Sequence, residues 1–388
     1  MHILHLLLSN NPVPAIFGGA VQQTVQELAE ECVRRGHKVT VISRANEAQK
    51  SELEKYNNQG VKYLYVYSKN TSRASLIKYL KEYIKIAIKN GPYDVVHTHV
   101  PYAAPIFSLF KKKLGNPKFI WHVHNKGKFT SITKLLNIEI VGISHSIIKE
   151  IGGSLNNQRY SVIPNICREK YFPLYTDESK HNSRLMLNIP ESKFVIAFVG
   201  RIVPEKGLHI LLEAIKNLSE ELQTKITLLV AGSSWFKNAE KNKYEQAIIN
   251  QSINMDVRWL GYVDNWSLYK IYHACDVFIM PSVWSEPAGQ VILEAQCCGT
   301  HVIASNVGGI PEYLSPFETT VEPNSPEKLA NEIKKLLLRK EVNINSSEHD
   351  KTIAKKRSDW VKDNFSLDKI TQMWLDYIQN DLYRNFID

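Results

Sequence analysis

The sequence predicts an α/β protein built from two doubly wound parallel-sheet domains. Its 388 residues suffice for two or three domains of about 150 residues each. The first half opens with a strand, a glycine turn, a helix and a second strand, and the second half repeats the alternation of strands and helices. The composition, 44% hydrophobic and 22% charged, is that of a soluble globular protein and excludes wholesale disorder and a disulfide scaffold.

The predicted N-terminal domain spans residues 1–175. A strand at 3–8 precedes Gly18 and Gly19, and the apolar residues after them, such as Val25 and Leu28, recur at helical spacing. Gly36 is placed to end this helix, and a strand follows at 38–43. Further strands are predicted at 61–67, 94–99, 119–124, 139–144 and 160–163.

The predicted C-terminal domain spans residues 185–364, after a polar stretch at 176–184 that interrupts the pattern. Strands are expected at 193–199, 226–231, 257–260, 277–280 and 302–304. Apolar and aromatic residues in the tail recur at roughly helical spacing, so 365–388 is predicted to be a terminal helix.

Charge and cysteine content limit which partners and which cellular compartment the sequence predicts. The net charge is +9, and all of the basic excess lies in the first 170 residues, because the remainder is net acidic. A basic half suits anionic partners such as a membrane surface or a phosphate-bearing acceptor. The five cysteines show no CxxC spacing, and no apolar run is long enough to span a membrane, so a cytoplasmic location with reduced thiols is predicted.

Open parallel sheets bind ligands at the carboxyl ends of their strands, so the site is expected in a cleft between the two domains. Residues 200–207 follow the first strand of the second half and contain Arg201 and Lys206. Two cations at a turn from a strand to a helix suit a phosphate or diphosphate. The alternative is that both are solvated surface cations.

The stretch 286–294 carries a second candidate set. Gly289 permits close backbone approach to a ligand, and Glu286 and Glu294 lie eight positions apart. Eight helical residues span about 12 Å, more than the roughly 5 to 9.5 Å that separates the carboxyl groups of glycosidases. The spacing therefore favours two separate roles, one carboxylate binding sugar hydroxyls and the other ribose hydroxyls, over hydrolysis. The alternative is a pair of surface glutamates.

Two His-x-His pairs, His97 with His99 and His122 with His124, each share one face of a predicted strand. Such a pair can begin a zinc site, but no nearby cysteine or carboxylate completes one. The histidines are therefore interpreted as polar groups at strand ends, and no metal site is predicted. No Asp-x-Asp motif is present, so a metal-held diphosphate is not predicted either.

Together, the stretches 200–207, 286–294 and 295–312 resemble the family-four retaining glycosyltransferases of GT-B fold. The resemblance implies that two Rossmann-like domains face each other across the cleft. The C-terminal domain would hold the donor and the N-terminal domain the acceptor, and the terminal helix would cross back onto the N-terminal domain. The resemblance implies catalytic roles for Arg201, Lys206, Glu286 and His124; donor contacts for Gly18, Gly19, Gly261, Tyr262, Val263, Gly289, Gln290, Val291 and Glu294; and an acceptor-side place for His99.

In this family Arg201 and Lys206 would bind the diphosphate, Glu294 the ribose and Glu286 the transferred hexose. The implied activity is metal-independent, retaining transfer of a hexose from an NDP-sugar, with a UDP-sugar favoured, to a hydroxyl acceptor. The nucleotide sugar is a co-substrate, so no cofactor is expected. The acceptor would be a surface glycan or a lipid-linked precursor.

Other interpretations remain open from the sequence. A nucleotide-sugar epimerase or phosphorylase of the same fold would share these motifs. A basic nucleic-acid-binding protein is opposed by the acidic second half and by the lack of any recognisable nucleic-acid module. The apolar stripe at 76–88, with lysines largely off it, suits either a helix on an anionic membrane surface or one packed on the sheet.

Overall fold

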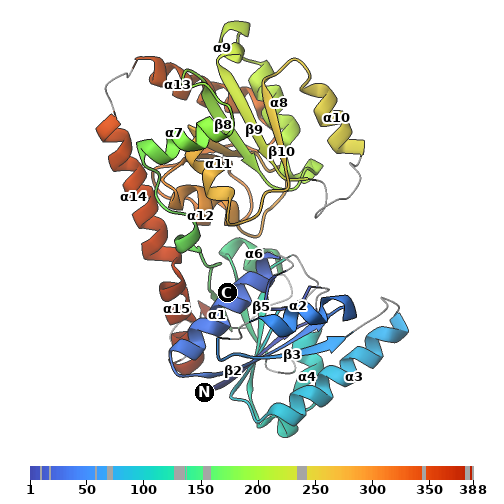
Figure 1. Ribbon diagram of the computed structural model, residues 1–388. Helices are drawn as coiled ribbons and strands as arrows, with labels where there is room; N and C mark the ends of the chain where they lie inside the picture. The colour runs from blue at the N-terminus through green and yellow to red at the C-terminus, as the bar shows by residue number, and fades with distance from the viewer. Residues whose placement is uncertain are drawn as a thin grey trace. The chain divides into compact units, whose positions relative to one another are not determined.

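The computed structural model describes residues 1–8, 11–16, 19–56, 59–67, 73–125, 136, 138–151, 159–233, 243–342, 347–380 and 385–386 (Figure 1). The chain divides into two compact units. The first comprises Met1–Ile166 and Leu367–Asp388, and the second comprises Cys167–Ser366. Each unit contains one predominantly parallel sheet and buries its own hydrophobic residues against it.

The N-terminal segment of the first unit ends at Ile166, nine residues before residue 175, where the domain predicted from the sequence ends. Backbone bonds explain the difference. The Cys167 N–H donates to the carbonyl of Phe365 at 2.7 Å, and the Tyr175 N–H donates to that of Cys298 at 3.0 Å. Residues 167–175 are thus bound into the second unit.

The sheet of the first unit has the strand order β14-β7-β6-β5-β4-β1-β2-β3. All pairs are parallel except the short β14, which is antiparallel to β7. Because β1 lies between β2 and β4, the direction of winding reverses at β1. The strands are β1 (His2–Leu7), β2 (Lys38–Ala45), β3 (Lys62–Tyr67), β4 (Val95–Thr98), β5 (Lys118–Val123), β6 (Glu139–Gly142), β7 (Arg159–Val162) and β14 (Asn385–Phe386).

Helices pack on this sheet, and one of them, α15, comes from the C-terminal end of the chain. Helix α15 packs against α1, where Arg35 forms an ion pair with Asp368 at 2.6 Å. Trp374 and Tyr377 of α15 are buried in the same core as Val25 and Leu28 of α1. The helices are α1 (Ala20–Arg34), α2 (Lys50–Lys55), α3 (Arg73–Asn90), α4 (Ala103–Ser108), α6 (His145–Ile151) and α15 (Leu367–Asn380).

Helix α3 is the basic amphipathic helix anticipated from the sequence. Tyr83 and Ala87 are buried, and the Tyr83 hydroxyl donates to the carbonyl of Leu7 in β1 at 2.9 Å. The lysines at 78, 81, 85 and 89 are exposed. The side chains of residues 76 and 77 lie outside the described part. The described apolar stripe therefore packs on the protein, and the lysines form the exposed face.

The second unit has the strand order β10-β9-β8-β11-β12-β13, and all of its pairs are parallel. Here the winding reverses between β8 and β11. The strands are β8 (Phe194–Val199), β9 (Ile226–Ala231), β10 (Val257–Gly261), β11 (Val277–Met280), β12 (His301–Ser305) and β13 (Thr319–Val321). The helices are α7 (Asp177–Met186), α8 (Leu208–Lys216), α9 (Glu220–Thr224), α10 (Lys243–Gln251), α11 (Leu268–Ala274), α12 (Gln290–Cys297), α13 (Pro326–Val342) and α14 (Ser347–Phe365).

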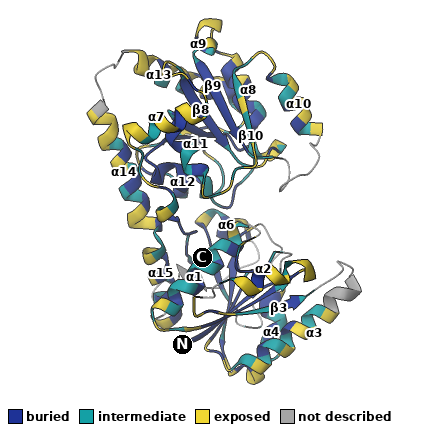
Figure 2. Cartoon of the chain, in the orientation of Figure 1, coloured by how far each residue is buried: buried dark blue, intermediate teal, exposed yellow. Residues whose placement is uncertain are grey.

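Both faces of this sheet are buried, as the dark strands of Figure 2 show. Val195 and Ala197 of β8 belong to one core, and Phe194, Ile196 and Phe198 belong to the other. This alternation explains why the strand is a continuous apolar run in the sequence. All five cysteines are buried free thiols. Among the described residues, no helix is both long enough and apolar enough to cross a membrane.

The polar stretch at 176–184 is not the simple interruption that the sequence predicted, because it forms most of α7. Thr176 and Ser179 form a capping box at the start of this helix. Arg184 is only 1% exposed and contacts the carbonyl of Ala274 and the carboxylate of Asp276. A buried arginine that binds backbone and carboxylate oxygens makes a polar segment part of the domain.

Short 3₁₀ turns complete the architecture and include the one that carries Lys206. They are η1 (Glu47–Gln49), η2 (Lys111–Leu114), η4 (Glu169–Tyr171), η5 (Pro204–Lys206) and η6 (Ile310–Tyr313).

Candidate functional site

Two loops meet where the winding of the second sheet reverses. One follows β8 and runs through Gly207 to α8, and the other follows β11. Gly207 has a φ of +72°, and a Cβ at this position would lie 1.8 Å from the carbonyl oxygen of Pro281. The Val283 N–H donates to the carbonyl of Glu205 at 3.0 Å. The backbones of the two loops are therefore in direct contact.

Gly207→Ala is expected to destabilise the second unit by about 3 kcal/mol or more, since it adds both strained backbone and a clash with Pro281. Gly261→Ala is the matched control, because Gly261 has a φ of +63° but no atom within 4 Å of an added Cβ. It should cost only about 1 kcal/mol. Denaturant unfolding of both variants measures the difference, and equal losses would contradict the contact between the loops.

Lys206 and Glu286, one from each loop, form an ion pair. The Lys206 Nζ lies 2.6 Å from the Glu286 Oε1. The same oxygen accepts hydrogen bonds from the Ser282 hydroxyl at 2.8 Å and the Trp284 Nε1 at 2.7 Å. Glu286 is 4% exposed. A lysine ammonium has three N–H donors, so the pair holds Lys206 in place and leaves further donors for a ligand.

Arg201, the other predicted cation, lies at the carboxyl end of β8. Its side chain is exposed, and it follows Gly200, which has a φ of +154°. The Gly232 N–H, at the end of the neighbouring strand β9, donates to the carbonyl of Gly261 at 2.7 Å. Tyr262 is 41% exposed and Val263 is half-buried. The residues predicted to border the base therefore lie at the same edge of the sheet as Arg201.

Helix α12 begins directly after the second loop. Gly289 is its N-cap and provides no side-chain hydrogen bond to the first turn, which Gln290 and Val291 begin. The N–H groups of a first helical turn have no partner within the helix, and they favour oxyanions or hydroxyl oxygens.

A third segment supports the loop that carries Glu286. Gly308, with a φ of +61°, lies against the backbone of Glu286, and the Gly309 N–H donates to the Glu286 carbonyl at 2.7 Å.

Glu294 lies inside α12 and is 3% exposed. Its Oε1 is 3.4 Å from the Arg168 Nη2, and its Oε2 accepts a hydrogen bond from the Tyr272 hydroxyl at 3.1 Å. Burial raises the pKa of Glu294, and Arg168 and Tyr272 oppose that shift. Each carboxylate oxygen can accept two hydrogen bonds, so a ribose hydroxyl would share these oxygens with the protein.

Of the predicted residues of the first unit, His99 and His124 directly follow the carboxyl ends of β4 and β5, and Gly19 directly precedes α1. The His99 Nδ1 is 2.9 Å from the His124 Nε2, so the structure places these two imidazoles together. Gly19, with a φ of +109°, is the N-cap of α1. Gly18 lies outside the described residues. Burial lowers the pKa of both His99 and His124 well below the usual value, so both are neutral near pH 7.

Several neighbours of these residues carried no signal in the sequence. Arg168 and Tyr272 are isolated residues far from Glu294 along the chain, and Ser282 and Trp284 stand outside the quoted motif. His5 was missed as well, although it lies opposite His97 in the sheet. His5 can be recognised as a neighbour of His97 only once the pairing of β1 with β4 is known.

Comparison with known proteins places this chain in a family. A model described as Glycosyl transferases group 1 matches residues 179–357, and one described as Glycosyltransferase Family 4 matches residues 17–165. The chain belongs to the family-four, group 1 glycosyltransferases. Two parallel α/β units, each with a reversal of winding, are the fold that the sequence resemblance implied.

Curated relatives cover most of this glycosyltransferase. Spore coat protein SA of Bacillus subtilis is 26% identical over 382 residues, which cover 93% of this chain and 97% of the relative. The lipopolysaccharide 1,2-N-acetylglucosaminetransferase of Salmonella typhimurium is 27% identical over 303 residues, covering 76% of this chain and 74% of the relative.

Solved structures support the GT-B fold of this glycosyltransferase. Anabaena HepE in complex with UDP-glucose aligns with a TM-score of 0.74 and 20% identity, covering 97% of this chain and 99% of HepE. Sucrose-phosphate synthase from Thermosynechococcus elongatus aligns with a TM-score of 0.78 and 21% identity, covering 98% of this chain and 99% of the synthase.

Proposed function

We propose that this glycosyltransferase moves a hexose from an NDP-sugar, with a UDP-sugar preferred, to a hydroxyl acceptor with retention of anomeric configuration. The observation that carries the proposal is the Lys206–Glu286 pair at the point where the second sheet reverses its winding. It brings a cation and a carboxylate to one place, as binding of a sugar diphosphate requires. The preference for UDP is supported by HepE, which was crystallised with UDP-glucose.

Charge development determines what the two cations do. When the bond from the anomeric carbon to the phosphate oxygen breaks, its electron pair passes to the diphosphate, which becomes more negative. Lys206 and the exposed Arg201 stabilise that charge, and no divalent ion is required on the diphosphate. Glu286 accepts hydrogen bonds from hexose hydroxyls, and backbone N–H groups of the Gly289 to Val291 stretch contribute donors.

Retention follows if the acceptor attacks on the face that the phosphate leaves. The departing phosphate oxygen then takes the acceptor proton, so no nucleophilic side chain is needed. His124 and His99 lie on the acceptor-binding unit in this proposal, where His124 contacts donor-sugar hydroxyls as a neutral imidazole and His99 lines the acceptor side. That both units contribute to one cleft stays a prediction from the family.

The acceptor we propose is a surface glycan or a lipid-linked precursor. The Salmonella relative, by its name, acts on lipopolysaccharide. The exposed lysines of α3 and of η2 form basic surfaces that suit an anionic acceptor or the membrane that carries it. Since the described apolar stripe of α3 is packed on the protein, such contact would be electrostatic and would weaken with salt.

A donor panel followed by product analysis tests the proposal. UDP-hexoses should raise the melting temperature more than GDP- or ADP-hexoses, because a ligand that binds the folded state stabilises it by mass action. NMR of the product formed from the preferred donor should show the donor's anomeric configuration, without added Mg²⁺ or Mn²⁺. An inverted product or a trapped glycosyl-enzyme would contradict the retaining mechanism. Conversion of the donor without any acceptor would instead identify an epimerase.

A further inference from the structure

Five histidines gather on one face of the first sheet, at the carboxyl ends of three adjacent strands. His5 of β1 is paired with His97 of β4, and residues paired in a parallel sheet present side chains to the same face. His99 lies two residues beyond His97 and shares that face, as His124 does with His122. The fold therefore unites two His-x-His pairs and a fifth histidine that are dispersed in the sequence.

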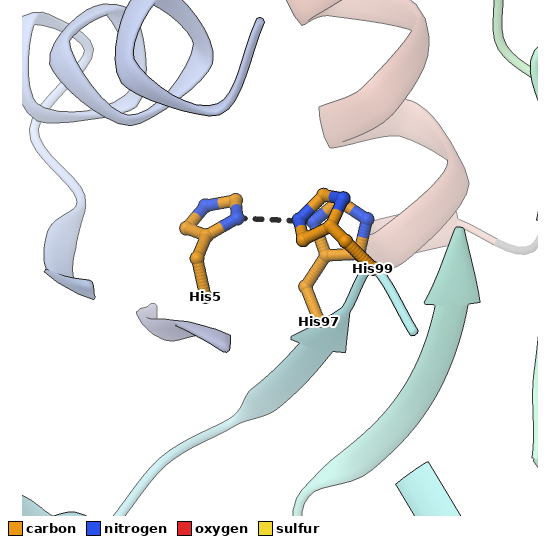
Figure 3. Close-up of side chains that lie close together, drawn as sticks. All are labelled: His5, His97 and His99. Carbon is orange, nitrogen blue, oxygen red and sulfur yellow. Dashed lines mark hydrogen bonds between the residues drawn. The ribbon is translucent and has the colours of Figure 1, made fainter. Parts of the chain in front are cut away.

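The ring nitrogens in this cluster are close enough to bind one ion. The Nδ1 atoms of His5 and His97 are 3.1 Å apart (Figure 3). One nitrogen from each of His5, His97 and His99 lies within 4.8 Å of the other two. Tetrahedral zinc with bonds of 2.0 to 2.1 Å places its nitrogen ligands about 3.3 Å apart. Small side-chain rotations thus suffice to bring three imidazoles around an ion.

Hydrogen bonding inside the cluster is incomplete. His5 and His97 are fully buried. Among the described residues, the buried Nε2 atoms of His5 and His99 have no hydrogen-bond partner. A neutral imidazole has one donor and one acceptor nitrogen, and leaving either of them buried and unpaired costs about 1–3 kcal/mol. A metal ion uses such a lone pair.

Neighbouring side chains hold the rings in place for coordination. The His97 Nε2 is 3.2 Å from the His122 Nδ1, and the His99 Nδ1 is 2.9 Å from the His124 Nε2. Trp374 of α15 stacks on His97, with ring centroids 4.1 Å apart. A histidine that binds a metal through one nitrogen usually donates from the other, and these contacts provide acceptors for two of the three rings.

We propose that His5, His97 and His99 bind one divalent transition-metal ion of the zinc type through their imidazole nitrogens. Imidazole ligands suit Zn²⁺, Co²⁺, Ni²⁺ and Cu²⁺ rather than Mg²⁺ or Ca²⁺. Three neutral ligands leave the ion's charge unbalanced, so the fourth position suits a hydroxide or an anionic oxygen. The proposal is independent of the donor chemistry above.

Metal titration of the full-length, tag-free protein tests the site. Zn²⁺ should bind with a stoichiometry of about one in calorimetry, and Co²⁺ should give the visible absorption of a tetrahedral site. X-ray absorption at the zinc edge should count three imidazole ligands. His5→Gln should abolish binding. His2→Gln is the control on the same strand, because His2 bonds to Pro92 and Thr40 outside the cluster.

His124→Gln distinguishes the alternative set, in which His99 would bind with His122 and His124. In the proposed site His124 only positions His99, so its replacement should weaken binding about 10- to 100-fold without abolishing it. Circular dichroism and melting without metal check that each variant folds. If His5→Gln does not fold, the zinc-edge spectra of the wild type and the metal affinity of His124→Gln decide together. Absence of Zn²⁺ and Co²⁺ binding by the wild type, or wild-type affinity in His5→Gln, would overturn the proposal.

Discussion

Lys206→Ala is expected to lower kcat/KM for sugar transfer by about 10²- to 10³-fold. Removal of a single preorganised group that stabilises developing charge has this effect in other enzymes. The Lys206 Nζ contacts the Glu286 Oε1 at 2.6 Å, so its loss also leaves a buried carboxylate without its cation. The larger part of the effect should fall on kcat, because the diphosphate gains its charge in the transition state.

Lys216→Ala is the matched control, since Lys216 is the exposed last residue of α8 and lies away from both loops. Its steady-state kinetics should stay within about twofold of the wild type. The pair Lys206→Ala and Glu286→Ala, made singly and together, adds a double-mutant test. Because the two side chains are in contact, their effects should not add. Wild-type kinetics in Lys206→Ala would refute the proposed donor site.

Asp276→Asn is expected to destabilise the second unit by about 3–5 kcal/mol, the range seen when one partner of a buried ion pair is removed. Asp276 precedes β11 and lies within 2.9 Å of three cations, Lys180, Arg184 and Lys340. Its Oδ2 also accepts the N–H of Val195, at 2.8 Å. The Arg184 side chain is 1% exposed and would lose its carboxylate.

The same carboxylate predicts an acid limit of stability. Burial raises the pKa of Asp276, but the three cations outweigh burial, and the pKa falls well below its usual value. A carboxyl with a depressed folded-state pKa stabilises the fold above its unfolded pKa of about 4, and this contribution is lost as the pH falls toward the folded value. The free energy of unfolding should therefore drop steeply below about pH 4 in the wild type and less steeply in Asp276→Asn.

Denaturant unfolding between neutral and acidic pH measures both effects. Asp363→Asn is a suitable control, because Asp363 is exposed on α14 in the same unit. It should change neither the stability at neutral pH nor the slope in acid. Equal stabilities of Asp276→Asn and Asp363→Asn would show that the cluster of cations around Asp276 contributes nothing.

The periodicity of the chain was sufficient to predict most of the fold. Strands such as β8 and β9 are uninterrupted apolar runs because both faces of the sheet are buried, and such runs are recognisable without a structure. Helix α7 was missed because its polar residues, among them Arg184, are buried through hydrogen bonds to the backbone and to Asp276. Hydropathy carries no information about such partners.

The candidate site likewise has parts that could be predicted from local sequence and parts that could not. Its local parts, Arg201 and Lys206 after one strand and Glu286 to Glu294 after another, depend on turns and helix starts that short stretches encode. The pairing of Lys206 with Glu286, and of Glu294 with Arg168 and Tyr272, depends on contacts between segments that are distant along the chain.

The sequence by itself determined the two α/β units, the family and the positions of the stretches 200–207 and 286–294 after their strands, because these follow from local patterns of apolar, glycine and charged residues. Only the tertiary structure decided which side chains meet. The histidine cluster is the clearest case, since the parallel pairing of β1 with β4 sets His5 beside His97 although 92 positions separate them. Strand order is a property of the whole sheet, and no single stretch of the chain records it.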